Sequence, residues 1–209
     1  MRLFNSNEQP MERTKALFTL GKTQLAQMNR HIYKLLPDTS DEIRLLAFNI
    51  LDEEEGVITR KIEGIYAELK QPIYTVGAKA KLYKSLGLLY WELIYGDLVL
   101  QELEPTILAK ALNYTKLAEH DLTADADLKA LLGKIYQRLG QYKEAEVAFT
   151  QALDLNIPAA QVLPYLAEIK YKLKDYSAMM YYLNLSQTLN DVQGIAQIKK
   201  LWNMYAECA

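Results

Sequence analysis

The sequence has few cysteines, few histidines and little net charge. It contains one cysteine, Cys208, and two histidines among 209 residues, with a net charge of −2. A single thiol excludes an intramolecular disulfide and a multi-cysteine zinc site. Because the charge is near neutral, no basic field would hold nucleic acid or an anionic membrane, and we expect neither as a partner.

Long hydrophobic runs are also missing. The longest, Leu86 to Trp91, ends at Glu92, whereas a membrane span needs roughly 20 apolar residues. The residues that follow Met1 carry no signal-peptide core. We therefore expect a cytoplasmic chain that does not itself enter a membrane. Any membrane association would come through a partner or through a segment outside this sequence.

Motifs for catalysis or ligand binding are scarce. The run 21–23 (Gly-Lys-Thr) lacks the upstream glycine of a phosphate-binding loop, and the acidic run 52–56 lacks the first ligand of a calcium loop. Neither His31 nor His120 has a second ligand at metal-binding spacing. No serine stands on a glycine-rich nucleophile elbow. We therefore expect no enzyme, and hence no catalytic residue, no metal ion and no cofactor.

Tyrosine, in contrast, is abundant. Fifteen tyrosines stand against four phenylalanines and two tryptophans, in a chain that is 50% hydrophobic and has only six prolines and nine glycines. A tyrosine packs an apolar ring while its hydroxyl stays wet or hydrogen-bonded. The composition therefore indicates a well-packed chain with many half-buried contacts, as helical repeats have.

An internal repeat with a period of 34 residues organises the second half of the chain. Each unit has the pattern of two amphipathic helices around a tight turn, at Gly140-Gln141 in one and Lys174-Asp175 in the next. Small residues let the paired helices approach closely, and large ones fill the remaining space. The matching pairs are Leu132 and Leu166, Gly133 and Ala167, Tyr142 and Tyr176, Ala145 and Met179, Phe149 and Leu183, Ala152 and Ser186, and Leu155 and Leu189.

The first of these units resembles the tetratricopeptide repeat (TPR) family. The resemblance is carried by Leu132, Gly133, Tyr136, Gly140, Tyr142, Ala145, Phe149, Ala152, Leu155 and Pro158. It implies an all-α solenoid of antiparallel helix hairpins. The next unit departs from the pattern at Lys170 and Met179, which stand where Tyr136 and Ala145 did, and this predicts looser packing.

An upstream unit is visible but irregular. Ala111 and Ala118 lie 34 residues before their counterparts, whereas Leu86, Gly87 and Tyr90 lie 46 before theirs. Twelve extra residues, 92–103, therefore separate the two halves, and Pro105 opens the second helix. The insertion is either a longer first helix or a binding projection. In the first case four residues would extend the core: Leu93, Ile94, Leu98 and Leu100.

These patterns predict four regions. Residues 1–11 form a mobile N-terminus, and 12–72 an N-terminal helical region with breaks near 37–40 and near Glu55-Gly56. Residues 78–190 form about three TPR-like hairpins, the first one extended. Residues 191–209 form a capping helix and tail, whose apolar positions are Ile195, Ile198, Leu201, Trp202 and Tyr205. Within 12–36, heptad spacing predicts a short seam that could join two copies of the chain, at Phe18, Leu25 and Ile32.

The TPR resemblance also implies a concave groove that binds a protein or peptide. Carried over residue by residue, the groove positions are Lys84, Leu88, Trp91, Ala130, Lys134, Gln137, Glu168 and Tyr171. The lysine and asparagine pattern that clamps a carboxylate in some TPR proteins is not evident. Trp91 and Tyr171 are either interface aromatics or packing residues between neighbouring units.

The order of segments gives a second, more specific resemblance. A helical lead over 41–52, the stretch 89–93 and the repeats with 162–168 resemble the cytoplasmic TPR component of bacterial pellicle (Pel) exopolysaccharide machinery. Together the resemblances predict a non-catalytic scaffold or adaptor. Two alternatives stay open: a regulatory or small-ligand-binding subunit of an enzyme complex, and a self-associating helical assembly protein.

Overall fold

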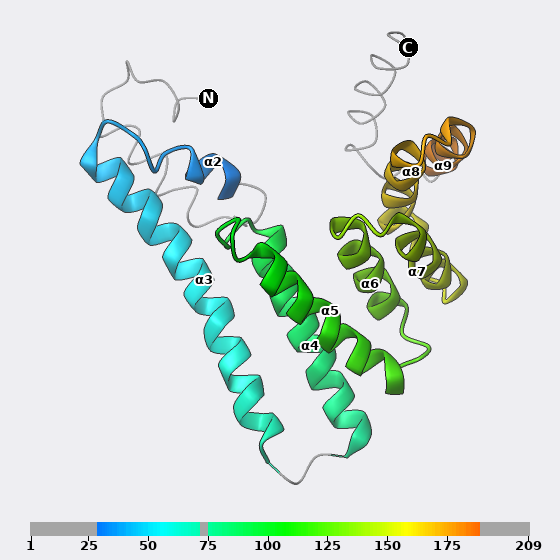
Figure 1. Ribbon diagram of the computed structural model, residues 1–209, viewed down its shortest axis with the longest axis horizontal. Coiled ribbons are helices and arrows are strands. Elements are labelled where there is room, and N and C mark those ends of the chain that lie inside the picture. The colour runs from blue at the N-terminus through cyan, green and yellow to red at the C-terminus, as the bar shows by residue number, and fades with distance from the viewer. Residues whose placement is uncertain (1–28, 72–74, 189–209) are drawn as a thin grey trace. The chain divides into compact units, whose positions relative to one another are not determined.

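The computed structural model describes residues 29–71 and 75–188, and every element in these ranges is helical (Figure 1). The predicted all-α class is confirmed. The elements are α2 (Asn29–Tyr33), α3 (Asp41–Leu69), α4 (Val76–Tyr95), α5 (Glu104–Asp121), α6 (Ala126–Arg138), α7 (Tyr142–Asp154), the 3-10 turn η2 (Ala159–Gln161), α8 (Leu163–Lys172) and α9 (Tyr176–Thr188). None of the described helices combines the length and apolarity that crossing a bilayer requires.

The chain divides into two compact units, which are described separately. Unit 1 comprises residues 1–75 and 85–111, and unit 2 comprises residues 76–84 and 112–209. Helices α4 and α5 contribute to both units. The predicted mobile N-terminus and the capping helix lie outside the described residues.

The long helix α3 dominates unit 1. Its buried stripe consists of Ile43, Ala47, Leu51 and Ile62. The predicted break near Gly56 is wrong, because the helix runs unbroken from Asp41 to Leu69. A glycine in a helix interior costs only about 1 kcal/mol, and burial of the stripe on both sides of Gly56 exceeds that cost.

The short helix α2 is tied to α3 by a buried amide. The Asn29 side chain is fully buried, and its Nδ2 donates to Glu54 Oε2 at 2.8 Å and to the Gly96 carbonyl at 2.9 Å. Ile32 and Leu35 nearby are also buried. Of the predicted seam, Ile32 is therefore covered by the chain itself, while Phe18 and Leu25 lie outside the described residues.

Four helices end in the same backbone turn. At the ends of α4, α6, α7 and α8 one residue takes a positive φ, and the following N–H donates to the carbonyl five residues before it. This hydrogen-bond pattern is that of a Schellman C-terminal cap. The positive-φ residues are Asp97, Gly140, Asn156 and Lys174, with φ of 50°, 74°, 65° and 61°.

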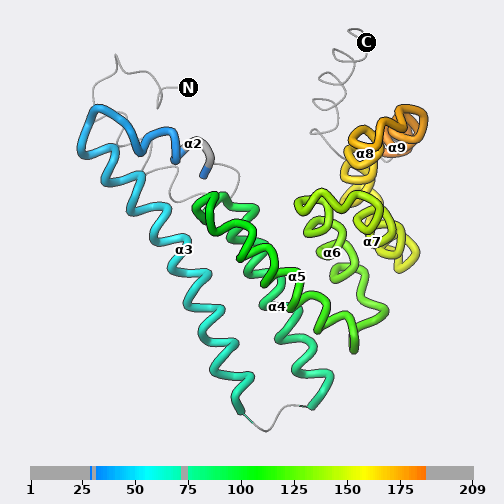
Figure 2. Tube along the Cα trace, viewed as in Figure 1, coloured from blue at the N-terminus to red at the C-terminus, as the bar shows by residue number. Residues whose placement is uncertain are grey.

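The two predicted hairpin turns are confirmed and match each other one period apart. Gln141 N donates to Tyr136 O at 2.9 Å, and Asp175 N donates to Lys170 O at 2.9 Å. Figure 2 shows α6 turning back into α7 and α8 turning back into α9 at these points. The left-handed conformation is free of a steric cost at Gly140, because glycine has no Cβ, but it is unfavourable for Lys174.

The twelve extra residues, 92–103, lengthen α4 and form the loop that leads to α5. Helix α4 continues to Tyr95, and α5 begins at Glu104 with Pro105 in its first turn, as predicted. Leu93, Ile94 and Leu98 are buried and extend the core. The prediction is wrong for Leu100, which is 65% exposed, because it follows the turn that ends α4 and so leaves the helical stripe.

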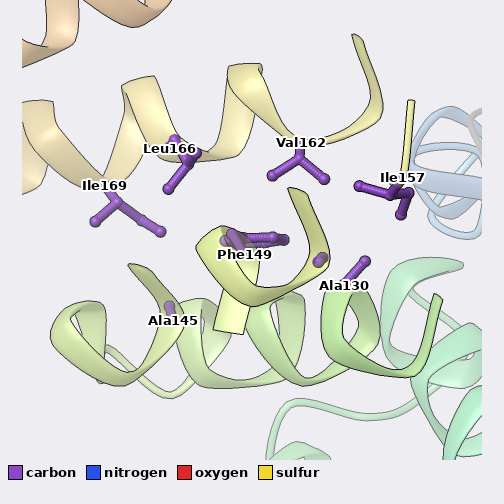
Figure 3. Close-up of a cluster of buried hydrophobic side chains, with 8 residues drawn as sticks. Ala130, Ala145, Phe149, Ile157, Val162, Leu166 and Ile169 are labelled. Carbon is purple, nitrogen blue, oxygen red and sulfur yellow. The ribbon is translucent and has the colours of Figure 1, made fainter. Parts of the chain in front are cut away.

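The main core of unit 2 surrounds Phe149, which comes from α7. Figure 3 shows the ring between Ala130 of α6 and Val162 and Leu166 of the following segment. A Cβ on Gly133 would lie 2.7 Å from the ring. The predicted close approach of α6 and α7 at a glycine is therefore confirmed.

The second hairpin, α8–α9, has a smaller core of Ala167, Met179 and Leu183. Lys170, the residue that replaces the tyrosine of the first unit, forms an ion pair with α7: its Nζ lies 2.7 Å from Glu146 Oε1. The expectation that Tyr176 packs inside the hairpin is wrong, because its side chain is 55% exposed. Its counterpart Tyr142 is covered by the cluster that includes α8, and no described helix follows α9.

Candidate protein-binding surface

Two sets of repeat-equivalent residues are accessible on the first helix of each hairpin. The first set is Leu88, Lys134 and Glu168, and the second is Trp91, Gln137 and Tyr171; each member is half-buried or exposed. Buried leucines precede the first set by two positions, at 86, 132 and 166. Because residues two positions apart point to different sides of a helix, the two sets lie on a face away from the buried leucines of the hairpin core. Leu88 and Trp91 belong to unit 1, and the remaining four belong to unit 2.

Lys134 is the best-defined member of the surface that α6 and α8 present in unit 2. Its ammonium lies 5.5 Å from the centroid of the Tyr165 ring, and that ring stacks on Phe149 at 5.3 Å. Burial lowers the pKa of Lys134 below the usual lysine value, and Asp127 opposes part of this change. The ammonium has no hydrogen-bonded or ion-paired acceptor among the described residues. A half-desolvated cation thus lies at the surface without a bonded anion.

Glu168 lies one turn after Tyr165 on α8. It follows Tyr165 by three positions, and residues three apart are neighbours on one helix face. Glu168 is exposed, whereas Gln137 on α6 is half-buried. Lys134 and Gln137 lie one turn apart on α6, and all three predicted groove residues, Lys134, Gln137 and Glu168, are accessible. We call these three, with Tyr171, the α6–α8 surface.

Tyr171 has a packing role. Its ring lies against the small core of Ala167, Met179 and Leu183, and it meets Tyr176 edge-on at 6.1 Å between centroids. The ring is half-buried rather than fully covered. Of the two interpretations of Tyr171, packing is observed, and the residue stays partly accessible.

Lys84 is bonded within the chain. Its Nζ lies 2.8 and 2.7 Å from the two carboxylate oxygens of Asp125, and Asp125 Oδ1 also accepts from Leu128 N at 2.9 Å to cap α6. Burial alone would raise the pKa of Asp125, but the Lys84 and Leu128 hydrogen bonds hold it below its usual value. Lys84 thus fastens α4 to the start of α6. Ala130 is buried in the main core and contributes no surface.

The two predicted residues of unit 1 lie on α4. Leu88 is 43% exposed, although its neighbour Leu89 is buried. Trp91 is half-buried and stacks on Tyr95 at 6.4 Å between centroids. Trp91 therefore has an intramolecular partner, and Leu88 is the more accessible of the two.

Lysine–tyrosine pairs are a feature that sequence reasoning missed. Lys110 lies over Tyr90 at 5.6 Å and Lys116 over Tyr136 at 5.7 Å, each measured from Nζ to the ring centroid. Together with Lys134 over Tyr165 they join neighbouring helices. The tyrosine excess hints at such contacts, but the partners are too far apart in sequence to be paired by spacing. Each contact contributes about 0.5–1 kcal/mol at an exposed site.

A second surface feature is a shallow hollow of about 360 Å³ on α4 and α5 within unit 2. It is lined by Tyr83, Asn113, Lys116, Leu117, His120 and Asp121. Tyr83 stacks on Tyr114 beside it, at 6.1 Å between centroids. Within residues 29–71 and 75–188 no three histidine, cysteine or acidic side chains gather as a metal site.

Comparison with known proteins assigns no family to the chain: no protein-family model matches it and no curated protein is similar to it. The functional proposal therefore depends on the fold and on the α6–α8 surface. That surface combines a half-buried cation without a bonded anion, an exposed carboxylate and a half-buried tyrosine.

Proposed function

We propose that the chain is a non-catalytic adaptor built from TPR-like hairpins, and that it binds a protein partner through the α6–α8 surface. The repeat supports the TPR-like interpretation because helix turns, hydrogen bonds and buried positions recur 34 residues apart. The glycine–phenylalanine contact between α6 and α7 is the packing that the repeat pattern predicts. Fold alone does not establish function, so the surface has to carry the proposal.

The observation that carries the proposal is the Lys134 ammonium. Burial of a cation without a bonded anion costs free energy unless a partner supplies the counter-charge. Within the chain, the Tyr165 ring compensates part of that cost. An acidic group of a bound protein would complete the site, and such a charge-assisted bond is stronger than a neutral one. Gln137 and Glu168 would fix the orientation of the bound segment.

The resemblance in segment order suggests where to look for that partner. If the chain acts as the cytoplasmic TPR component of exopolysaccharide machinery does, its partners are other components of a membrane-associated assembly. The adaptor function itself does not depend on this assignment. A different protein partner on the same surface would leave the proposal intact.

Affinity capture from the native cell tests the adaptor function. The bait is the full chain, compared with a Lys134→Met, Glu168→Lys variant that removes one surface charge and reverses the other. The control is Glu144→Lys, an exposed position on α7. We expect a set of proteins that wild type and the control retain and that the double variant loses. Equal recovery with all three baits would contradict the assigned surface.

A further inference from the structure

Helix α3 of unit 1 has a hollow on its surface that the proposed function does not use. Its volume is about 430 Å³. The lining consists of Gly56, the four residues three or four positions away from it, and one further glutamate: Asp52, Glu53, Thr59, Arg60 and Glu55. Residues at these spacings surround a given position on a helix surface. The hollow therefore lies where Gly56 provides no side chain.

The fold does not require a glycine at residue 56. Gly56 lies in the interior of α3, where glycine is less favourable than alanine. Among the described residues, a Cβ there would meet only the side chain of Arg60, whose Nη1 would lie 3.2 Å away. Gly133 and Gly140, in contrast, serve a close helix contact and a left-handed turn. What the glycine provides at residue 56 is open space on the surface of the helix.

Negative charge predominates around this space. Asp52, Glu53 and Glu55 contribute three carboxylates against the one guanidinium of Arg60, and all four side chains belong to exposed residues. Such a surface attracts a cationic side chain and repels an acidic one. A metal ion fits less well, because one helix supplies the whole lining and nowhere in the described part of the chain do three histidine, cysteine or acidic side chains converge as ligands.

Two exposed apolar side chains lie on the same face, nearer the start of α3. Leu45 and Phe48 are 61% and 56% exposed. The series Leu45, Phe48, Asp52 and Gly56 advances in steps of three and four residues, so its members share one side of the helix. From Phe48 to Gly56 the helix rises about 12 Å. The face therefore combines an apolar pair with an acidic hollow at a fixed distance.

We propose that this face of α3 binds an amphipathic helix of another protein. A Lys or Arg of that helix enters the hollow at Gly56, and a bulky apolar residue about seven or eight positions away packs on Leu45 and Phe48. A helix fits because its rise per residue reproduces the spacing of the two features, and because side chains of one helix insert into holes between the side chains of another. The face belongs to unit 1, and the inference is independent of the α6–α8 surface of unit 2.

Selection from a display library of helical peptides, each about 18 residues or five turns long, tests the site on the full chain. We expect enrichment of Lys or Arg about seven or eight positions from Leu, Met or Phe. In fluorescence anisotropy, Gly56→Leu should weaken binding of the selected peptides about tenfold or more, because its side chain fills the hollow. Gly64→Leu is the matched control on α3, where a Cβ meets nothing within 4 Å. It should leave the affinity unchanged.

The melting temperature separates lost binding from lost folding. Both glycine replacements should raise it, because leucine is the better helix former. Asp52→Asn should weaken peptide binding and Arg60→Gln should strengthen it, each severalfold, and added salt should weaken it. Charge changes that act in the reverse directions would contradict a cationic occupant.

Three other results would overturn the inference. The first is an unchanged affinity of the selected peptides for Gly56→Leu. The second is a loss of binding only with the Lys134→Met, Glu168→Lys variant, which would assign the peptides to the α6–α8 surface and so support the proposed function alone. The third is calorimetric binding of Ca²⁺ that Asp52→Asn abolishes, which would assign the hollow to a metal ion.

Discussion

The Phe149 ring occupies the space that a side chain at residue 133 would need. A Cβ placed on Gly133 would lie 2.7 Å from two carbons of the ring. The ring cannot move away easily, because it is fully buried and stacked on Tyr165. This contact sets how closely α6 and α7 approach each other.

Replacement of Gly133 by alanine should therefore destabilise the fold. Alanine favours a helix by about 1 kcal/mol over glycine, but forced overpacking costs about 1–3 kcal/mol, so the expected net change is a loss. Gly64 in α3 is the matched control, since a Cβ there meets nothing within 4 Å. Gly64→Ala should gain stability. Urea unfolding measures both, and a Gly133→Ala protein as stable as wild type would contradict the packing.

At the two hairpin turns, adding a glycine and removing one should change stability in opposite directions. Lys174→Gly should raise stability by about 1 kcal/mol, because a non-glycine residue at positive φ is strained. Gly140→Ala should lower stability by a similar amount. No atom lies within 4 Å of a Cβ at Gly140, so this loss would be a backbone effect alone. Thermal unfolding of the two variants, compared with wild type, shows whether the signs are opposite.

The Lys84–Asp125 pair predicts an acid-sensitive contribution to stability. The pKa of Asp125 is lowered in the folded state, so its contribution is present above the ordinary value of 3.8 and is lost as the pH falls through the folded value. Asp125→Asn keeps a good helix N-cap but removes the charge. It should cost about 1 kcal/mol or less at pH 7. Chemical unfolding between pH 7 and acid should show the difference from wild type disappearing; a constant difference would exclude the ion pair as its cause.

Lys134→Met should separate binding from folding. Removal of the desolvated cation should favour folding, and loss of the cation–π contact should disfavour it, so the net change in stability should stay within about 1 kcal/mol of zero.

In the wild-type chain, the pKa of the Lys134 amine should lie below the ordinary 10.5, because burial disfavours its charged form. NMR titration of the labelled side chain measures that pKa. A value of 10.5 or above would show that the ammonium is not desolvated.

The sequence predicts the features that depend on local pattern. The turns at Gly140 and Lys174, the glycine–phenylalanine contact and the proline that opens α5 all follow from residue type and period. The break at Gly56 was wrong because packing on both sides outweighs one unfavourable residue. Leu100 was misplaced because the turn after α4 interrupts the stripe.

The candidate surface could be predicted only in part. Equivalent positions on the repeats identified Lys134, Gln137 and Glu168 as accessible, and the structure agrees. The pairing of Lys84 with Asp125 spans 41 residues and has no local signal. The Tyr165 ring beneath Lys134 is likewise contributed by another helix. Contacts of this kind depend on tertiary packing, which helical periodicity does not specify.

Site-specific photo-crosslinking tests the central claim most directly. A photoreactive amino acid replaces Glu168 on the α6–α8 surface, or Val147 on α7, which is exposed outside that surface. After irradiation in the native cell, position 168 should give a discrete crosslink to a protein partner, and Lys134→Met should reduce it. Position 147 should give none. A crosslink from 147 to the same partner, with none from 168, would contradict binding through the α6–α8 surface.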